Sequence, residues 1–129
     1  MNKQLIEIID LPKIYDPRGS LTVAEENIHM PFSIAQVEWI NFNNASPSAN
    51  ALATSGISDV PLMLVALAGE IMLHIEDNRI QEKNKIQAQD VTLNCPYQGV
   101  IIPEGYSLKM ISVSEATVLL KIKGKAAKQ

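Results

Sequence analysis

The sequence predicts an all-β protein built as a jelly roll. Its apolar segments are short and rich in β-branched residues, and turn residues separate them at close spacing. No stretch has the apolar periodicity of a useful amphipathic helix. Apolar residues make up 47% of the 129 residues, which is enough to bury one core. We expect a single domain over residues 1–124, followed by a flexible tail over residues 125–129.

The first half of the chain alternates strands with turns. Asp16-Pro17-Arg18-Gly19 is typical of a turn, because proline presets its own φ and glycine accepts a positive φ. The strands expected in this half are Leu5–Ile9, Ser20–Ala24 and Phe32–Phe42. Alternation along the last of them predicts that Trp39 and Glu38 point to opposite faces of the sheet.

The second half begins with a long uncharged segment, Asn43–Ser58, rich in Asn, Ser, Ala and Thr. Loops of this length inside a domain are often functional. Ala68-Gly69 is expected to form a hairpin turn. The strands expected after the loop are Val60–Leu67, Glu70–Ile75, Arg79–Ile86, Val91–Leu93, Gly99–Ile102, Leu108–Val113 and Thr117–Lys123.

Charge and cysteine content exclude several classes of function. Eleven basic and 14 acidic residues give a net charge of −3, so no basic surface is expected for nucleic acid or for a membrane. Cys95 is the single cysteine, which excludes an internal disulfide and a thiolate zinc site. No signal peptide and no apolar run of about 20 residues is present. These features predict a cytoplasmic protein.

Two stretches resemble the motifs of the cupins. Gly99–Gly105 resembles the second motif, in which a histidine stands where this chain has Leu108. Gly69 matches the hairpin glycine of the first motif, which places the glutamate of that motif at Leu62 and its two histidines at Ser55 and Ile57, or one residue later at Gly56 and Ser58. A metal centre needs three or four converging N, O or S donors. No metal is therefore expected at these positions.

A closer resemblance lies in the N-terminal half. Asp16–Asn27, with Pro31-Phe32-Ser33-Ile34 after it, is similar to the opening of the thymidine-diphosphate-sugar 3,4-ketoisomerases. The resemblance implies an RmlC-like cupin jelly roll (a double-stranded β-helix). It also implies metal-independent, cofactor-free chemistry on a 4-keto-6-deoxy sugar nucleotide, in deoxysugar or surface-polysaccharide biosynthesis.

The resemblance does not extend to the family's acid and base residues. The family moves protons with a His-x-His pair, and this pair falls on Ser55 and Ile57 when counted back from Gly69. A Trp-His pair of the family is replaced by Tyr106-Ser107. Either the chemistry has moved to other residues or it has been lost.

The remaining candidates for a site are few. Arg18 occupies the Arg-Gly position that lies near the diphosphate in related proteins, although an ion pair with Asp16 or Glu26 would explain it equally well. Trp39 and Tyr106 are aromatic residues expected near the barrel mouth, with core or interface packing as the alternative for Trp39. Further candidates are the hydroxyls of Thr54, Ser55 and Ser107, and Tyr106 or Glu38 as an acid or base.

The histidines and the cysteine have simple structural interpretations. His29 lies in a polar connection and is interpreted as a surface residue. His74 shares a sheet face with Met72 rather than with Leu73, and is interpreted as a hydrogen-bonded residue of that face. Cys95 is interpreted as a small buried hydrophobe.

Three functions remain open. The first is a binder of a thymidine-diphosphate sugar without catalytic activity, and the second is an isomerase or epimerase that uses residues other than histidine. The third is a structural module whose barrel is filled by side chains such as Leu52, Ile57, Leu62 or Leu108. The apolar runs Val60–Leu67 and Val118–Leu120 favour a homodimer.

Overall fold

The computed structural model describes residues 6–42, 58–77 and 87–125. Within them the chain forms ten strands and no helix, so the all-β prediction is confirmed and none of these residues forms a helix that could cross a membrane. The strands are β1 (Glu7–Asp10), β2 (Lys13–Asp16), β3 (Gly19–Thr22), β4 (Ile34–Phe42), β5 (Leu62–Ala68), β6 (Ile71–Asp77), β7 (Gln87–Leu93), β8 (Gln98–Ile102), β9 (Tyr106–Val113) and β10 (Thr117–Gly124).

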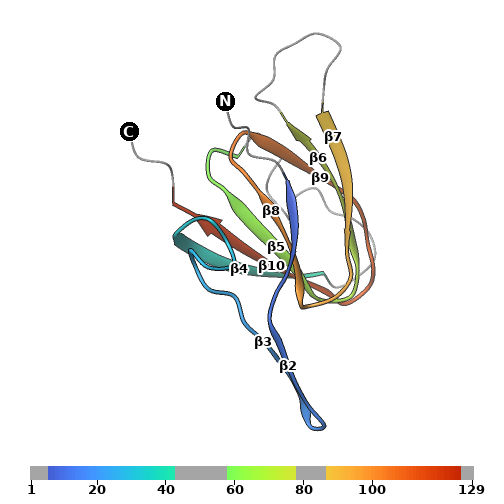
Figure 1. Cartoon of the computed structure of the whole chain (residues 1–129). Coiled ribbons are helices and arrows are strands. Elements are labelled where there is room, and N and C mark those ends of the chain that lie inside the picture. The colour runs from blue at the N-terminus through green and yellow to red at the C-terminus, as the bar shows by residue number, and fades with distance from the viewer. Residues whose placement is uncertain (1–5, 43–57, 78–86, 126–129) are drawn as a thin grey trace.

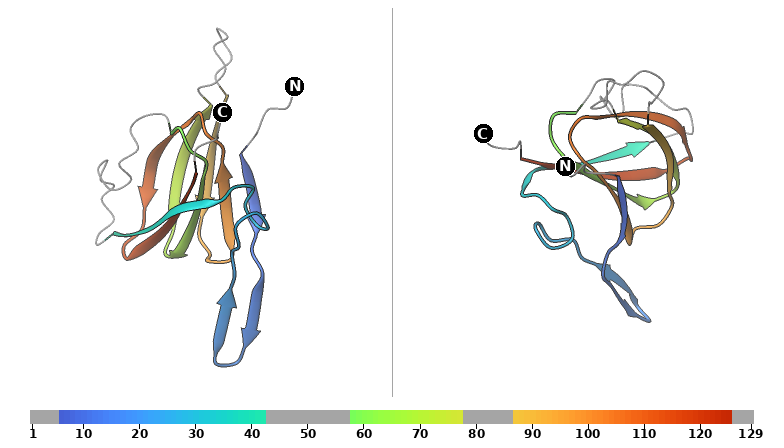
Figure 2. Two further views of the ribbon diagram at one scale, coloured as in Figure 1. Left: turned by 90° about the vertical axis from the view of Figure 1, so that its left-hand side faces the viewer. Right: turned by 45° about the horizontal axis from the view of Figure 1, so that its top comes forward.

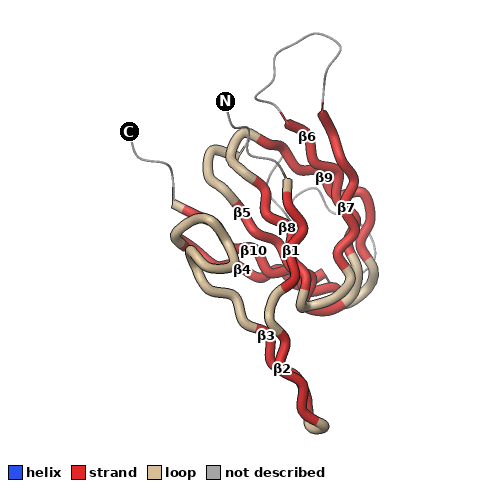
Figure 3. Tube along the Cα trace, in the orientation of Figure 1, coloured by secondary structure: helices blue, strands red, loops and turns tan. Residues whose placement is uncertain are grey.

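Two antiparallel sheets face each other and enclose the main core (Figures 1 and 3). One has the strand order β1-β8-β5-β10-β4 and the other the order β7-β6-β9. The hairpin of β2 and β3 stands apart from both and extends beyond the end of the barrel at which β5 turns into β6 (Figures 1 and 2). We call the opposite end, where β6 ends and β9 begins, the barrel mouth.

Strand β5 is buried on both of its faces from Leu62 to Ala66. Its inward side chains join a cluster that fills the space between the sheets. Its outward side chains, Met63 and Val65, pack under the connection before β4, where Met30 and Phe32 cover the sheet. This two-sided burial explains the unbroken apolar run in the sequence, because a strand that meets solvent on one face alternates instead.

The structure differs from the predicted elements at two places. Lys13–Asp16 forms strand β2, which pairs in register with β3, although no strand is predicted before the turn. Its four residues are mostly exposed, so no burial pattern marks them. In the second sheet, β7 begins at Gln87 instead of Val91. Of the predicted strand Arg79–Ile86, all residues lie outside the described part of the chain.

Gly69 makes the predicted hairpin turn between β5 and β6. Its φ of +79° is a conformation that L residues rarely adopt. A Cβ at this position would overlap the Oγ1 of Thr117 and lie 2.8 Å from the Cα of Thr117. Thr117 is fully buried and its hydroxyl donates to the carbonyl oxygen of Ser114 at 2.7 Å. The turn therefore needs glycine both for its backbone angle and for the close approach of β10.

We expect Gly69→Ala to lower the free energy of unfolding by about 2 kcal/mol or more, because positive φ and the clash with Thr117 both strain the folded state. Urea unfolding followed by circular dichroism measures the change.

Ala116 provides the matched control. It lies beside the same turn and has a φ of +60°. Ala116→Gly should relieve strain and leave stability unchanged or raised by up to about 1 kcal/mol. Equal destabilisation by both substitutions would contradict this account of the turns.

Candidate functional site

Polar side chains gather at the mouth end of the barrel on the inner face of the five-stranded sheet. On β10, Leu119 packs in the main core, so strand alternation also directs Lys121 and Lys123 inward. On β4, Ile40 packs against the same core, and Glu38 shares its face. Glu38 and Lys121 are cross-strand partners, which brings an acid and a base together inside the barrel.

Lys121 is the most deeply buried of these groups. Its side chain is 6% exposed, while that of Glu38 is 38% exposed, and its Nζ lies 3.9 Å from Glu38 Oε1. The other carboxylate oxygen of Glu38 accepts a hydrogen bond from Gln36 Nε2 at 3.0 Å. Burial lowers the pKa of Lys121, and the charge of Lys123 lowers it further, against the opposing effect of Glu38. The structure thus holds an amine that gives up its proton more readily than an exposed lysine.

Tyr106 begins β9 at the same end and is buried, opposite the buried Asp77 of β6. The backbone of Ser58 fixes this corner, because its N–H donates to the carbonyl of Tyr106 at 3.0 Å and its carbonyl accepts from the N–H of Gly105 at 2.8 Å. Ser107, the next residue, alternates to the outer face of the three-stranded sheet. Of the two predicted site residues Tyr106 and Ser107, only Tyr106 points into the barrel.

The other predicted site residues lie elsewhere or outside the described residues. Trp39 is 63% exposed on the outer face of β4. Arg18 lies at the tip of the β2–β3 hairpin with its side chain 91% exposed, and its Nε lies 3.1 Å from Asp16 Oδ1. These bonds from Arg18 hold the pKa of Asp16 below its usual range. Thr54 and Ser55 belong to the part of the chain that is not described.

Two of the positions at which cupins carry metal ligands, Leu62 and Leu108, are apolar core here. Leu62 and Leu108 are 1% and 7% exposed and belong to the main cluster. Among the described residues, no group of three or more His, Cys, Asp and Glu side chains converges as metal ligands would. These two leucines fill the interior, as the structural-module hypothesis requires, but Glu38 and Lys121 show that the inner face remains polar nearby.

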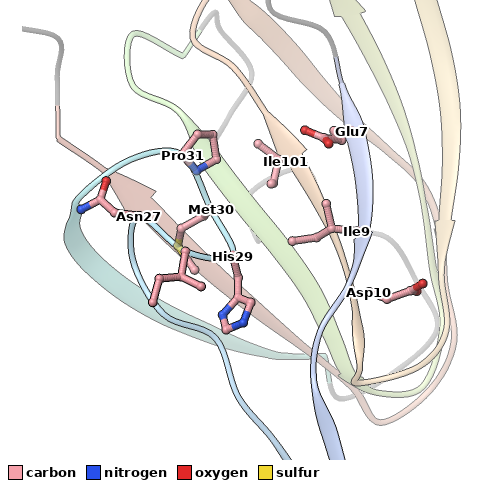
Figure 4. A pocket seen from close by; sticks show the side chains of 9 residues that line it. Glu7, Ile9, Asp10, Asn27, His29, Met30, Pro31 and Ile101 are labelled. Atoms are coloured by element: carbon pink, nitrogen blue, oxygen red, sulfur yellow. The ribbon is translucent and has the colours of Figure 1, made fainter.

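A separate cavity of about 410 Å³ lies on the outer side of the five-stranded sheet, between β1 and the connection at residues 27–31 (Figure 4). Ile9, Met30 and Ile101 form part of its lining, together with His29. The Nδ1 of His29 accepts a hydrogen bond from the backbone N–H of Glu25 at 2.8 Å, so a neutral His29 ring carries its proton on Nε2. No pattern in the sequence predicts this cavity, because its lining comes from segments far apart in the chain.

His74 stands on the outer face of β6, as its spacing predicts. Its Nδ1 lies 2.7 Å from Asp90 on β7, and its Nε2 lies 3.3 Å from Glu76 on its own strand. Lys109 of β9 is its cross-strand partner on the other side. The hydrogen bonds to Asp90 and then to Glu76 raise the pKa of His74. It is a hydrogen-bonded residue of the sheet surface.

The chain matches a protein family and resembles a characterised relative in sequence. The family model described as "FdtA: WxcM-like, C-terminal" matches residues 4–126. A TDP-4-oxo-6-deoxy-alpha-D-glucose-3,4-oxoisomerase of Aneurinibacillus thermoaerophilus is 29% identical over 114 residues, which are 88% of this chain and 75% of that protein.

Solved structures share the fold. A mutant of the 3,4-ketoisomerase QdtA of Thermoanaerobacterium thermosaccharolyticum, in complex with TDP-4-keto-6-deoxyglucose, superposes with a TM-score of 0.72 at 21% identity, over 96% of this chain and 83% of that one. The dTDP-4-dehydrorhamnose 3,5-epimerase of Bacillus anthracis superposes with a TM-score of 0.76 at 14% identity, over 95% and 74%. The predicted RmlC-like cupin jelly roll is confirmed.

The pH dependence of stability should reveal the environment of His74. A raised pKa means that protonation favours the folded state, so this contribution is complete below the unfolded pKa of about 6.5 and is lost as pH rises through the higher folded pKa. We expect the difference in melting temperature between wild type and His74→Gln to be larger at pH 5.5 than at pH 8.5. Asp90→Asn should shrink the pH dependence, since Asp90 is the larger cause, and a difference that does not vary with pH would refute the assignment.

Proposed function

The chain belongs to the FdtA family (WxcM-like, C-terminal), and from this premise we propose that it binds a thymidine-diphosphate 4-keto-6-deoxy sugar at the barrel mouth. The observation that carries the proposal is the family match over residues 4–126, which include every described strand of the barrel. The relative of Aneurinibacillus and the ligand-bound neighbour support the same class of ligand. The proposal includes a role in deoxysugar or surface-polysaccharide biosynthesis. The polar groups at the mouth, Glu38, Lys121 and Tyr106, suit the hydroxyl and carbonyl groups of such a sugar.

We further propose a cytoplasmic homodimer held by the β2–β3 hairpin. Ile14, Tyr15 and Leu21 are 60%, 76% and 57% exposed on this hairpin, and a lone two-stranded hairpin is marginal in water. The outer face of β4, an edge strand, exposes Val37 and Trp39 at 43% and 63%. Packing each hairpin on the other copy's β4 would cover both apolar surfaces.

This dimer also accounts for the position of Arg18. The hairpin tip points away from the mouth of its own barrel (Figure 2). A two-fold axis perpendicular to the barrel turns the partner's mouth in the direction of that tip. Arg18 is then positioned to contribute its guanidinium to the diphosphate bound by the second copy, where a planar fork of donors fits best.

Calorimetry with TDP-4-keto-6-deoxyglucose tests the binding proposal. We expect saturable binding to the wild type, and Tyr106→Phe should weaken it roughly 2- to 10-fold if the hydroxyl bonds the ligand, since one hydrogen bond contributes about 0.5–1.5 kcal/mol. Tyr97→Phe, at a half-exposed tyrosine next to β8, should leave the affinity unchanged. Absence of any binding would support the structural module with a filled barrel instead.

Light scattering on a sizing column tests the dimer. Tyr15→Glu should convert a dimer to a monomer, because a charge would be buried in an apolar contact. Trp39 is the only tryptophan, so its emission should shift to longer wavelength in the monomer. Ile111→Glu, on the three-stranded sheet, should leave the dimer intact. A wild-type monomer at micromolar concentration would refute the interface.

A further inference from the structure

The environment of Lys121 differs from that of an ion pair on a protein surface. Its side chain is 6% exposed, and it lies inside the barrel near the mouth. Its cross-strand partner on β5 is Leu64, which is fully buried, and Leu119 precedes it on the same face of β10. On the side of β4 its Nζ lies 3.9 Å from a carboxylate oxygen of Glu38.

Such surroundings suit a proton-transferring amine. A buried ammonium loses hydration, which disfavours its charged form, and a second cation nearby has the same effect. Lys123 is that second cation, since it lies two residues further along the same face of β10. On β5, the residues facing this pair of lysines are Leu62 and Leu64, which carry no charge.

We propose that Glu38 is the catalytic base and Lys121 the catalytic acid of a keto-sugar isomerisation at the barrel mouth, with Glu38 acting on the sugar carbons and Lys121 on the sugar oxygens. The proposal rests on the proposed function, because it requires the 4-keto sugar to bind beside this pair. It assigns to Lys121 and Glu38 the proton transfers for which the chain has no histidine pair.

The reaction conserves atoms and electrons in two steps. First, the Glu38 carboxylate takes the proton from C3. The C3–H electron pair forms the C3=C4 double bond, and the carbonyl pair moves to O4, which receives a proton from the Lys121 ammonium. Next, the neutral amine of Lys121 takes the proton of O3 as the C3=O bond forms, and the Glu38 carboxyl group gives its proton to C4. The pair ends as it began, with one proton on Lys121, so no oxidant or reductant is needed.

The positions of Glu38 and Lys121 fit these two roles. The cross-strand pairing of Glu38 and Lys121 holds both groups on one face, so they reach neighbouring atoms of one ligand. The hydrogen bond from Gln36 fixes one oxygen of Glu38 and leaves the other toward Lys121. The alternative is an ion pair that only stabilises the β4–β10 ladder, and it makes different predictions for substitutions at Lys121.

The test combines binding and solvent exchange on the same samples. TDP-4-keto-6-deoxyglucose is incubated with the full-length protein in D₂O, deuterium at C3 is followed by NMR, and affinity is measured by calorimetry. We expect wild type to bind and to catalyse exchange. Lys121→Met and Lys121→Arg should bind within a few-fold of wild type but exchange at least about 100-fold more slowly, the range that general acid–base groups supply.

Arginine separates the two roles. It keeps the positive charge, so a purely structural ion pair would be rescued in Lys121→Arg, whereas its guanidinium cannot give up a proton near neutral pH. Glu38→Gln should also slow exchange, and Lys125→Met, at an exposed lysine just beyond β10, should not. The rate of exchange by wild type should fall at alkaline pH, and the midpoint of this fall should lie below pH 10.5, because the pKa of Lys121 is lowered from that value.

Each outcome is decisive. Binding without exchange in wild type, or full exchange in Lys121→Arg, overturns the catalytic role and leaves the binding function standing. Loss of exchange with retained binding in both Lys121 variants supports it. If wild type does not bind the sugar nucleotide at all, the proposed function fails, and this inference fails with it.

Discussion

The two-sided burial of β5 is the constraint on which the rest of the molecule depends. Its inward residues meet the second sheet, and its outward residues Met63 and Val65 require the cover that Met30 and Phe32 provide. The connection before β4 must therefore fold back over the sheet, and this places β4 at the edge beyond β10. Closure of the barrel and the position of the edge strand both follow from the need to remove one strand from water on both faces.

The same packing decides where polar chemistry can exist. Between the sheets, the positions of Leu62 and Leu108 are occupied by core side chains, so a converging set of donors has no place there. Burying a lysine in such an interior is unfavourable unless it is paired or neutral. Lys121 meets this condition through Glu38 on the edge strand, whose carboxylate is 38% exposed and so retains part of its hydration. The partly solvated edge strand β4 thus stabilises the charge of Lys121, which would be unfavourable at the centre of the sheet.

Most of the fold could be predicted from turn residues and apolar runs, because each strand that packs in the core leaves a pattern. Each exception has a physical cause. Strand β2 pairs with β3 but leaves most of its own residues exposed, so they carry no burial signal. Trp39 was expected near the mouth, but strand alternation from Ile40 already directs it outward. Lys121 was missed, although the same counting from Leu119 would have placed a lysine inside the barrel.

The absence of the family's histidine pair changes what the scaffold must supply. Imidazole titrates near neutrality without help, so a histidine site can remain hydrated. An amine titrates near 10.4 in water, and its ammonium form becomes a useful acid only when its surroundings disfavour the charge. Leu64 and Leu119 provide those surroundings for Lys121, and they belong to the core that holds the sheets together. In this chain the packing that stabilises the fold and the environment that tunes the acid are the same side chains, so core mutations near β10 should alter chemistry and stability together.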